Sequence, residues 1–594
     1  MKTSKNIDNL AIAELLRNVA GALKLGSSSA NKFRIVAYER AADAVEHLSS
    51  EAKDLWDEGS LQEVSGIGKN IAEYLGEIFK TGKSKHFEGI LKDLPPAMFE
   101  LMKVPGIGAK TAFKLTKELN IKEKKNALTS LKKAIAEGKI KKIEGFGEQS
   151  EESIQKSIKE VKGRKNKRHF LPYAEEIAQE IITWMKKESA VASIKPLGSL
   201  RRKVSTIGDI DLAVATEKPL DVLNHFANYP KKNRVLEKGE KTASIILPGN
   251  IQVDLMVSPQ KSFGSLLQHF TGSKHHNIAL REHANKKGYS LSEYGLKSQK
   301  SGSDLKTFKT EEELYKFLGV EWIPPEMRED RGEIEKAREE KLPRLVEIGD
   351  VKGDLQIHSD FDIETSHDVG ASSMMDVVKK AEGLGYEYIA FTEHNPSKGG
   401  HNESQTIEIL KRKKETVEKL NQELNGGLKR VFNSLEIDIL PDGRLPVSEK
   451  GLELLDFALV SIHSSFKQSR EETTKRVLDA LSFHPKIKVF AHPTGRKLTQ
   501  REGVELDWEK VFELCKKENK FLEINAEPMR LDLPDFLVKD ALDAGVKFTF
   551  GTDAHHIDHM DKMEYGVANA RRGWATKEDV INTLPTKTIE KLLL

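Results

Sequence analysis

After residue 350 the sequence repeats one pattern, in which short apolar runs end in a polar residue and alternate with helix-like segments. The runs are DLQIHSD, YIAFTEHN, VFNSLEID, FALVSIHS, KVFAHPTG, FLEINAE and FTFGTDAHH. Short strands that alternate with helices are typical of a parallel α/β sheet or barrel. In such barrels the active site gathers at the C-terminal ends of the strands. We therefore expect the polar residues that end these runs to lie close together.

Histidine, aspartate and glutamate at the run ends are residue types that bind transition metals. A lone histidine is usually a surface residue or a core residue with satisfied hydrogen bonds, and this alternative applies to each position taken singly. Their joint placement favours a metal cluster of His358, His394, Glu436, His463, His492, Asp553 and His555. Imidazole together with carboxylate suits Zn²⁺, Mn²⁺ or Fe²⁺ better than Mg²⁺ alone. Such a cluster can activate water against a phosphodiester.

The charge of the chain is unevenly distributed. Residues 1–350 hold 60 basic and 50 acidic residues, whereas residues 351–594 hold 35 basic and 42 acidic residues. A basic surplus is typical of proteins that bind a polyanion, so we expect nucleic acid to bind the first part. The single cysteine, Cys515, excludes an internal disulfide and a cysteine-rich zinc site, and favours the cytoplasm. We expect neither an export signal nor a membrane span.

Two similar glycine elements lie in the basic part, SGIG at 65–68 and PGIG at 105–108. Glycine allows close backbone approach, and the N–H groups that begin the next helix can bind a phosphate. One copy could be a simple helix cap. Two copies favour helix-hairpin-helix binding of the DNA backbone, and neither has the GxxxxGK[ST] pattern of an ATP-binding loop. The predicted contacts are Gly66, Gly68, Gly106 and Gly108.

The stretch GSLRRKVSTIGDID (198–211) predicts a second kind of site. Its Gly-Ser turn, followed by Arg201 and Arg202, offers a hydroxyl, N–H groups and guanidinium groups to a triphosphate. Asp209 and Asp211 would project from one face of a strand, where carboxylates about 4 Å apart repel by about 4 kcal/mol at an effective dielectric of about 20. Asp254 in NIQVDLMV would complete a two-metal phosphoryl-transfer site for Mg²⁺. The alternative is an edge strand with a solvated acidic face.

Over residues 1–320 the chain resembles the family X DNA polymerases, through GSLRRKVSTIGDID, VDLMV, HFTGSKHHNIALREHA and GYSLSEYGL. The resemblance implies that Asp209, Asp211 and Asp254 are catalytic and hold two Mg²⁺ ions. It also implies nucleotide contacts and a template-strand contact. The nucleotide contacts would be Gly198, Ser199, Arg202 and Gly208 at the triphosphate, and Phe270, Gly272 and Asn277 at the sugar, while Arg281 would contact the template strand.

Three positions depart from the pattern of that family. His269 stands where a tyrosine is common, which affects the exclusion of ribose. Gln252 replaces an arginine that precedes the third aspartate in animal members. Tyr74 stands where lyase-active members have a lysine that forms a Schiff base, so we do not expect that lyase activity, and Lys69 is a poor substitute.

Over residues 350–594 the chain resembles the polymerase-and-histidinol-phosphatase (PHP) domain of bacterial family X polymerases. The resemblance implies a distorted α/β barrel with a trinuclear metal site and 3′→5′ exonuclease activity. Gln356 replaces the first histidine of a His-x-His motif, and an amide oxygen is a weaker ligand. The loop FDIETSHDVG (361–370) should supply a further ligand, for which Asp368 is favoured over His367. In TEHN, Glu393 replaces a commoner aspartate, and His394 is the expected ligand.

These features predict a multidomain protein that acts as a gap-filling DNA repair polymerase with a linked metal-dependent exonuclease. Its expected substrates are gapped or nicked DNA and deoxynucleoside triphosphates, and we expect a monomer that binds no membrane. One alternative is a template-independent nucleotidyltransferase, and another is a DNA-binding nucleotidyltransferase whose PHP domain is structural and catalytically weak. The expected domains are a helical lyase-like domain (1–90), a second helix-hairpin-helix domain (91–163), an α+β palm (164–260), a thumb (261–324), a linker (325–350) and the PHP domain (351–594).

Overall fold

The computed structural model falls into two compact units, residues 1–167 and residues 168–594. Predicted contacts Gly66 and Gly106 lie outside the described residues. Within the described part, every helix is too short or too polar to span a lipid bilayer. The described residues are 9–26, 30–46, 52–57, 59–64, 67–104, 107–147, 151, 154–155, 168–299, 305–499 and 501–594.

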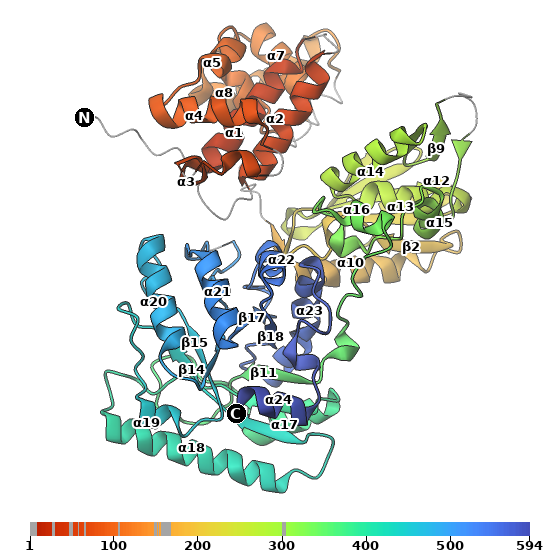
Figure 1. Ribbon diagram of the computed structural model, residues 1–594. Helices are drawn as coiled ribbons and strands as arrows, with labels where there is room; N and C mark the ends of the chain where they lie inside the picture. The colour runs from red at the N-terminus through yellow and green to blue at the C-terminus, as the bar shows by residue number, and fades with distance from the viewer. Residues whose placement is uncertain are drawn as a thin grey trace. The chain divides into compact units, whose positions relative to one another are not determined.

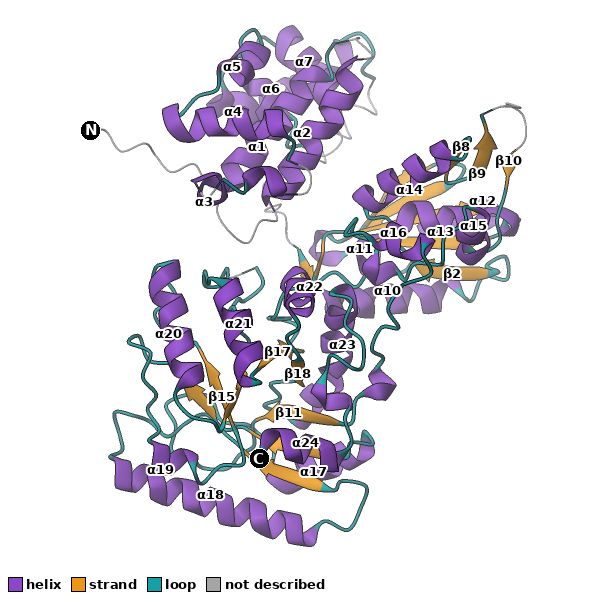
Figure 2. Ribbon diagram, in the orientation of Figure 1, coloured by secondary structure: helices purple, strands orange, loops and turns teal. Residues whose placement is uncertain are grey.

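The described regular structure of the first unit is helical (Figure 2). Gly68 caps the N-terminus of α4 and Gly108 that of α7, so both glycines stand where a helix begins. One apolar core is built around Leu16 and Leu75, and a second around Leu115 and Leu131. The elements are α1 (Asn9–Leu23), α2 (Ala30–Glu46), α3 (Ala52–Asp57), η1 (Leu61–Glu63), α4 (Lys69–Thr81), α5 (Lys85–Leu91), α6 (Pro96–Leu101), α7 (Ala109–Glu118), η2 (Lys124–Asn126), α8 (Ala127–Ala136) and η3 (Ile140–Lys142).

The second unit begins with a 5-stranded sheet in the order β2-β4-β7-β6-β5, in which only β4 and β7 run parallel. Apolar residues of α10 and α12 pack with those of β4 and β7 in one core. The elements are β1 (His169–Phe170), α10 (Leu171–Met185), β2 (Ser193–Pro196), α11 (Gly198–Arg201), β3 (Thr206–Ile207), β4 (Ile210–Ala215), α12 (Pro219–Ala227), β5 (Arg234–Lys238), β6 (Thr242–Ile246), η4 (Pro248–Asn250) and β7 (Gln252–Ser258).

Helices and a small antiparallel sheet follow, in the strand order β10-β9-β8. Residues 325–350, for which we expected a linker, pack against this part instead of forming an open tether. Met327, Ile334 and Ala337 are buried in its core. The elements are η5 (Gln260–Ser262), α13 (Phe263–Thr271), α14 (Lys274–Lys286), β8 (Tyr289–Ser292), β9 (Gly295–Ser298), β10 (Leu305–Lys306), α15 (Glu311–Phe317), η6 (Pro325–Met327) and α16 (Glu333–Arg338).

The C-terminal part is an α/β barrel. Its two sheets, β11-β12-β13 and β14-β15-β16-β17-β18, contain only parallel pairs. Parallel bridges join Ile357 to Ala554 and His394 to Glu436, so the two sheets form one distorted, closed surface.

Helices flank the barrel strands, and Figure 1 shows α20 and α21 beside β15 and β17. The multidomain α/β architecture predicted from the sequence is thus confirmed. The elements are η7 (Ile348–Asp350), β11 (Gly353–Ile357), α17 (Met374–Gly383), β12 (Tyr388–Phe391), α18 (Glu403–Glu423), β13 (Arg430–Asn433), β14 (Glu436–Asp438), α19 (Glu449–Leu452), β15 (Ala458–Ser461), α20 (Arg470–Ser482), β16 (Ile487–Phe490), α21 (Trp508–Glu518), β17 (Phe521–Asn525), α22 (Asp535–Ala544), β18 (Phe548–Gly551), η8 (Ile557–Lys562), α23 (Met563–Arg572), η9 (Ile581–Thr583) and α24 (Thr586–Leu593).

Candidate active sites

Three carboxylates meet on the sheet of the palm. Asp211 and Asp254 are direct partners in the parallel pair β4–β7, and Asp209 lies two residues before Asp211. Burial, together with the charges of Asp209 and Asp254, raises the pKa of Asp211 to about 7. Burial also raises the pKa of Asp254. Because these acids destabilise one another's charged form, the site favours a bound cation.

The turn before α11 lies directly against these acids. Gly198 has φ +55, and a Cβ atom built on it would lie 2.5 Å from Oδ2 of Asp211. The backbone N–H of Leu197 donates to the carbonyl oxygen of Asp211 at 2.8 Å. Only glycine satisfies both the positive φ and the close approach. The phosphate-binding candidates of this turn and the acids therefore belong to one site.

Arg202 is the C-cap residue of α11 and lies at the end of this turn. Its Nε donates to Oε1 of Glu329 at 3.1 Å, and its NH1 donates to the carbonyl oxygen of Thr271. A Cβ atom built on Gly272, which has φ +70, would lie 3.1 Å from that NH1. Arg202 and Gly272 are thus brought together, while Ser199 lies within α11 and the exposed Gly208 directly precedes Asp209.

The predicted sugar-side residues lie on α13 and at the start of α14. Asn277 is buried, and its Nδ2 donates to the carbonyl oxygen of His269 at 2.6 Å. Its Oδ1 accepts from Nε2 of Gln268 at 2.7 Å. Phe270 is half-buried, and Arg281 is half-buried on α14, four residues after Asn277. These contacts fix the orientation of the Asn277 amide.

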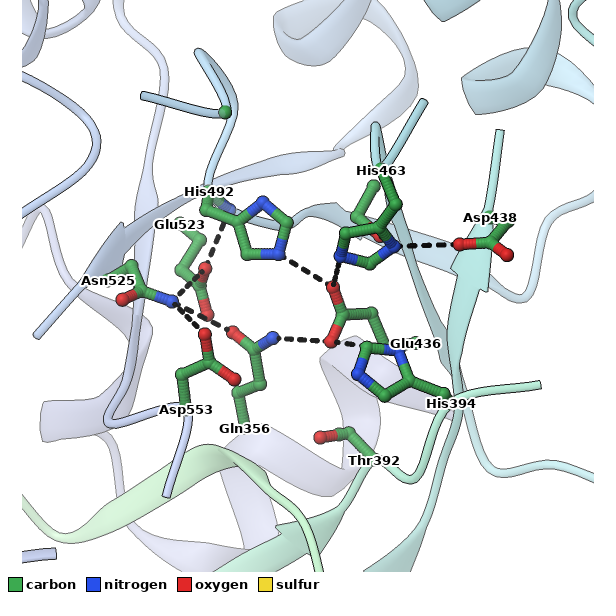
Figure 3. A network of polar contacts seen from close by, with 12 residues as sticks. Gln356, Thr392, His394, Glu436, Asp438, His463, His492, Glu523, Asn525 and Asp553 are labelled. Atoms are coloured by element: carbon green, nitrogen blue, oxygen red, sulfur yellow. Dashed lines mark hydrogen bonds and ion pairs between the residues drawn. The ribbon is translucent and has the colours of Figure 1, made fainter. Parts of the chain in front are cut away.

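The second cluster lies at the C-terminal ends of the barrel strands, where the sequence pattern placed it. Glu436 is at its centre (Figure 3). Its Oε1 lies 2.7 Å from Nε2 of His492 and 3.3 Å from Nε2 of His463. Its Oε2 lies 3.3 Å from Nε2 of His358 and 3.8 Å from Nδ1 of His394.

Two more of the predicted residues adjoin His358. Oδ1 of Asp553 lies 3.3 Å from Nε2 of His358, and the ring of His555 stacks on that of His358 with centroids 4.3 Å apart. His492 and Asp553 have φ values of +28 and +54, which are strained for residues other than glycine. Such strain is typical of sites where the surrounding structure holds functional side chains in place.

The electrostatics of this cluster fit a bound cation. Burial alone would lower the pKa of His358, but the carboxylates of Asp553 and Glu436 outweigh it and raise that pKa to about 10. Burial lowers the pKa of His394 to about 3, although Glu436 opposes the shift. Buried ring nitrogens without a hydrogen-bond partner include Nδ1 of His394, Nδ1 of His492 and Nε2 of His555. Buried carboxylates beside imidazole nitrogens without hydrogen-bond partners are a donor set that fits a divalent metal.

Gln356 occupies the position of the missing histidine. Its Nε2 donates to Oε2 of Glu436 at 2.9 Å, and its Oε1 lies 3.4 Å from Nδ2 of Asn525. The same Nδ2 donates to Oε2 of Glu523 at 3.1 Å. The amide of Gln356 therefore directs its nitrogen, which cannot bind a metal, toward the central carboxylate (Figure 3).

Sequence reasoning missed Asp438, Glu523 and Asn525. Asp438 follows Glu436 by two residues on β14, and its Oδ1 lies 2.7 Å from Nδ1 of His463. Glu523 and Asn525 alternate in the same way on β17. The period of two in EID and EIN is the signal that could have found them, because alternate strand residues share a face.

The loop at 361–370 places two side chains beside the cluster, those of the favoured Asp368 and of His367. The Asp368 side chain is 79% exposed, and its Oδ2 lies 3.8 Å from Nε2 of His555. His367 lies deeper, with its ring centroid 4.6 Å from that of His394. Glu393 does not face the cluster: it accepts a hydrogen bond from Oγ of Ser359 and pairs with the buried Lys413 at 2.6 Å.

Comparisons with known proteins agree with this geometry. Residues 266–329 match the DNA polymerase beta thumb, residues 7–84 a helix-hairpin-helix domain, and residues 58–122 and 98–160 a SAM-like helix-hairpin-helix tandem. The chain is 35% identical over 584 residues to the "DNA polymerase/3'-5' exonuclease PolX" of Bacillus subtilis, covering 98% of each chain. The chain belongs to the family X DNA polymerases.

Two further relatives each match only part of this family X polymerase. DNA polymerase lambda of Rattus norvegicus is 25% identical over 364 residues, which is 54% of this chain and 56% of that one. A probable phosphatase of Thermoanaerobacter sp. is 26% identical over 222 residues, which is 36% of this chain and 84% of the phosphatase. Family membership makes the chain a DNA polymerase, with DNA and nucleotides as its substrates.

The departures from the family pattern have structural counterparts. Nε2 of Gln252 donates to both carboxylate oxygens of Asp254, at 3.1 and 3.0 Å, so this uncharged side chain orients the carboxylate without adding a positive charge. Tyr74 stacks on His86 with ring centroids 4.0 Å apart, which makes it part of the packing of the first unit. His269 contacts Phe270 edge-on with centroids 4.8 Å apart.

Proposed function

We propose that this family X polymerase extends a DNA primer at Asp209, Asp211 and Asp254, which hold Mg²⁺. The observation that carries this proposal is the direct pairing of Asp211 with Asp254, beside a glycine turn that admits no side chain. Bound Mg²⁺ would neutralise charge on the triphosphate and favour deprotonation of the primer hydroxyl. The residues of the chain supply the positioning: the acids fix the cations, and Gln252 fixes Asp254.

The nucleotide and DNA contacts are assigned within this proposal. Gly198, Ser199, Arg202 and Gly208 would hold the triphosphate, and the raised pKa of Asp211 supports a preference for positive charge beside them. Phe270, Gly272 and Asn277 would lie against the sugar and base, and Arg281 against the template. Gly66, Gly68, Gly106 and Gly108 would bind the DNA backbone, and two such elements favour a monomer acting on gapped or nicked DNA. The functional units of this proposal are a helical lyase-like domain (1–90), a second helix-hairpin-helix domain (91–163), a palm (164–260), a thumb (261–324) and the PHP domain (351–594), with residues 325–350 packed against the thumb.

The second proposed activity is a metal-dependent 3′→5′ exonuclease in the PHP domain, residues 351–594. The full-length similarity to the B. subtilis exonuclease and the unpartnered buried imidazoles support it. Zn²⁺, Mn²⁺ or Fe²⁺ would supply an activated water when bound. The ligands would be His358, Asp368, His394, Glu436, His463, His492, Asp553 and His555.

Gln356 favours a competing possibility, in which the PHP domain is structural and catalytically weak. Its amide nitrogen donates to Glu436, so one side of the cluster lacks a ligand. The two possibilities differ in the fate of a DNA 3′ end. They agree on the polymerase site.

Primer extension on a duplex with a short gap tests the proposed function. The wild-type chain should add the nucleotide that the template specifies, and Asp254→Asn should abolish addition. Addition that ignores the template would show a template-independent nucleotidyltransferase instead. With Mn²⁺ and no nucleotides, the wild-type chain should shorten the primer, and the absence of shortening with Mn²⁺, Zn²⁺ and Fe²⁺ would favour a structural PHP domain.

A further inference from the structure

His367 lies beside two of the proposed metal ligands, His394 and His463, but has no role in the proposed function. Its ring lies 4.6 Å from that of His394 and 4.9 Å from that of His463, measured between centroids. One nitrogen from each of these three residues can be chosen so that all lie within 4.8 Å of one another. Three imidazoles at this separation are a donor set for a metal of the Zn²⁺ type.

Asp438 connects His367 to the cluster. Its Oδ2 lies 2.8 Å from Nε2 of His367, and its Oδ1 lies 2.7 Å from Nδ1 of His463. One carboxylate thus orients two imidazoles. A carboxylate that bonds one nitrogen of a histidine fixes the ring and increases the basicity of the other nitrogen, which is the usual support for a metal ligand.

An independent observation points to a ligand on this face. Nδ1 of His394 is buried and has no hydrogen-bond partner, with Oε2 of Glu436 3.8 Å away. A buried polar atom without a partner costs about 1–3 kcal/mol, so a protein retains it where something else binds it. The same Oε2 accepts a hydrogen bond from Nε2 of Gln356 at 2.9 Å (Figure 3), and this bond leaves Nδ1 of His394 without a hydrogen-bond partner.

We propose that His367, oriented by Asp438, is a metal ligand that joins His394 and His463. This assignment adds a residue of the loop at 361–370 to the proposed ligand set and gives Asp438 the role of orienting it. The inference rests on the proposed function only in requiring that the PHP domain binds a divalent metal. The inference assigns the loop's ligand role to His367, whereas the sequence favoured Asp368.

The test is binding of Co²⁺ to the full chain after metal removal, followed by the visible absorption of histidine-bound Co²⁺ and by the number of ions retained. His367→Ala should weaken the binding of one ion by about 10- to 100-fold, and Asp438→Asn should weaken it by about tenfold. His401→Ala is the matched control, because His401 also pairs with a carboxylate, at 2.9 Å from Glu364, but lies outside the cluster. Unchanged primer extension in each variant shows that the chain is folded.

Wild-type affinity for Co²⁺ in His367→Ala, or an equal loss in His401→Ala, would overturn the assignment. Loss in Asp368→Ala but not in His367→Ala would overturn it in favour of Asp368. If the wild-type chain binds no Co²⁺ through histidine, the proposed metal-dependent function fails as well. If the wild-type chain binds Co²⁺ and His367→Ala binds it equally well, only the assignment of His367 fails, so the two failures are distinguishable.

A separate observation concerns Arg572, the last residue of α23. Its side chain is 7% exposed, and its NH2 lies 3.0 Å from Oε1 of Glu329 and 2.8 Å from Oδ2 of Asp535. Its NH1 donates to the backbone carbonyl oxygen of Arg202 at 2.7 Å. Glu329 also binds Nε of Arg202. Arg572 of the C-terminal barrel therefore contacts the turn that carries Arg202 in two ways. It binds the backbone carbonyl group of Arg202 directly, and it binds Glu329, which pairs with the Arg202 side chain.

We infer that Arg572 is a positioning residue for nucleotide binding at the polymerase site. It touches no substrate itself. It orients Glu329, the carboxylate that also accepts from Nε of Arg202, and it orients the backbone carbonyl group of Arg202 at the end of the turn. Because hydrogen bonds to charged groups are the strong ones, loss of this arrangement should loosen the turn without removing any group that binds the substrate.

Steady-state primer extension distinguishes a positioning role of Arg572 from a general loss of structure, because the two affect KM and kcat differently. Arg572→Ala should raise the KM for the nucleotide by about tenfold with a smaller change in kcat, and Arg572→Lys should restore part of the loss. The control is Arg571→Ala: Nε of Arg571 binds Glu326 at 2.9 Å in the same region but contacts no atom of the turn. An unchanged KM in Arg572→Ala, or an equal rise in Arg571→Ala, would overturn the inference.

Discussion

Gly198 shows how one missing side chain allows the polymerase site to form. Its φ of +55 is strained for other residues, and the space its Cβ would need is occupied by the carboxylate of Asp211. The turn that carries Ser199 and Arg202 can therefore lie directly against Asp211. In the proposed function, this close approach would set the distance between the triphosphate and the cations.

Replacement of Gly198 by alanine should abolish most primer extension, because the new methyl group would meet Oδ2 of Asp211 at 2.5 Å. We expect a loss of about a hundredfold or more in kcat/KM, the size typical when a group at the transferring phosphate is misplaced. Exonuclease activity should remain. Gly249→Ala is the matched control, since Gly249 has φ +80 but open space around its Cβ position. Equal losses in both variants would show that backbone strain, not the clash with Asp211, is responsible.

The residues that the sequence could predict are those whose chemistry follows directly from a motif. Asp209 and Asp211 stand two apart before and within a strand, and His463 and His492 end apolar runs, so their residue types and positions predict metal binding. The orientation of Gln356 could not be predicted, because it depends on Asn525, which lies 169 residues away in the chain. His367 was ranked below Asp368 because the loop has no periodicity that would reveal which side chain turns inward.

At the scale of an element, α15 is held by a buried charge network. Glu311, its first residue, accepts from Arg328 at 2.6 Å and pairs with Arg201, and Arg328 is fully buried. Burial alone would raise the pKa of Glu311, but Arg328 and Arg201 outweigh it and lower that pKa to about 2. The network joins the thumb to the turn that carries Arg202.

The stability of this element should depend on pH below about 4.5. Because the folded pKa of Glu311 lies below its ordinary value, the stabilisation is present at higher pH and is lost as the pH falls from 4.5 toward 2. The shift corresponds to about 3 kcal/mol. Hydrogen exchange of α15 between pH 6 and pH 3 should show this loss in wild type, whereas Glu311→Gln should be destabilised throughout and depend less on pH. Glu312→Gln, an exposed neighbour, should behave as wild type, and an unchanged profile in Glu311→Gln would contradict the prediction.

The starts of α4 and α7 make a second prediction at this scale. Gly68 and Gly108 cap these helices, and a Cβ atom built on either would meet nothing within 4 Å. Aspartate at both positions should preserve the helices, because it caps them well, but its carboxylate would occupy the N–H groups that we propose bind phosphate. We expect weaker DNA binding and a shallower dependence of log affinity on log salt concentration, by about 0.9 for each phosphate that is no longer bound.

The corresponding double alanine variant is the control for the aspartate substitutions. It adds a Cβ atom at each cap without adding charge, so its DNA affinity should stay close to that of wild type. Fluorescence anisotropy with gapped DNA at several salt concentrations measures both quantities. Equal DNA affinity in the aspartate variant and wild type would contradict the assigned role of these helix starts.

At the scale of the whole molecule, the polymerase and PHP parts of residues 168–594 share a core. Trp574, which follows α23, packs in the same apolar cluster as Leu280 of α14 and Met327 of η6. Arg331 and Arg572 both bind Asp535 of α22. The sequence predicted two chemistries in one chain, but packing between residues hundreds of positions apart leaves no local pattern. For that reason residues 325–350 looked like a linker.

In the proposed function, the oxygen-ligand site makes phosphodiester bonds and the histidine-rich site breaks them. The most direct test follows one labelled primer on a gapped duplex, with Asp211→Asn and His463→Ala compared under the same metal ions. Asp211→Asn should lose extension and keep shortening, whereas His463→Ala should keep extension and lose shortening. Loss of both activities in either variant, or shortening that survives in His463→Ala and disappears in Asp211→Asn, would contradict the assignment of two separate centres.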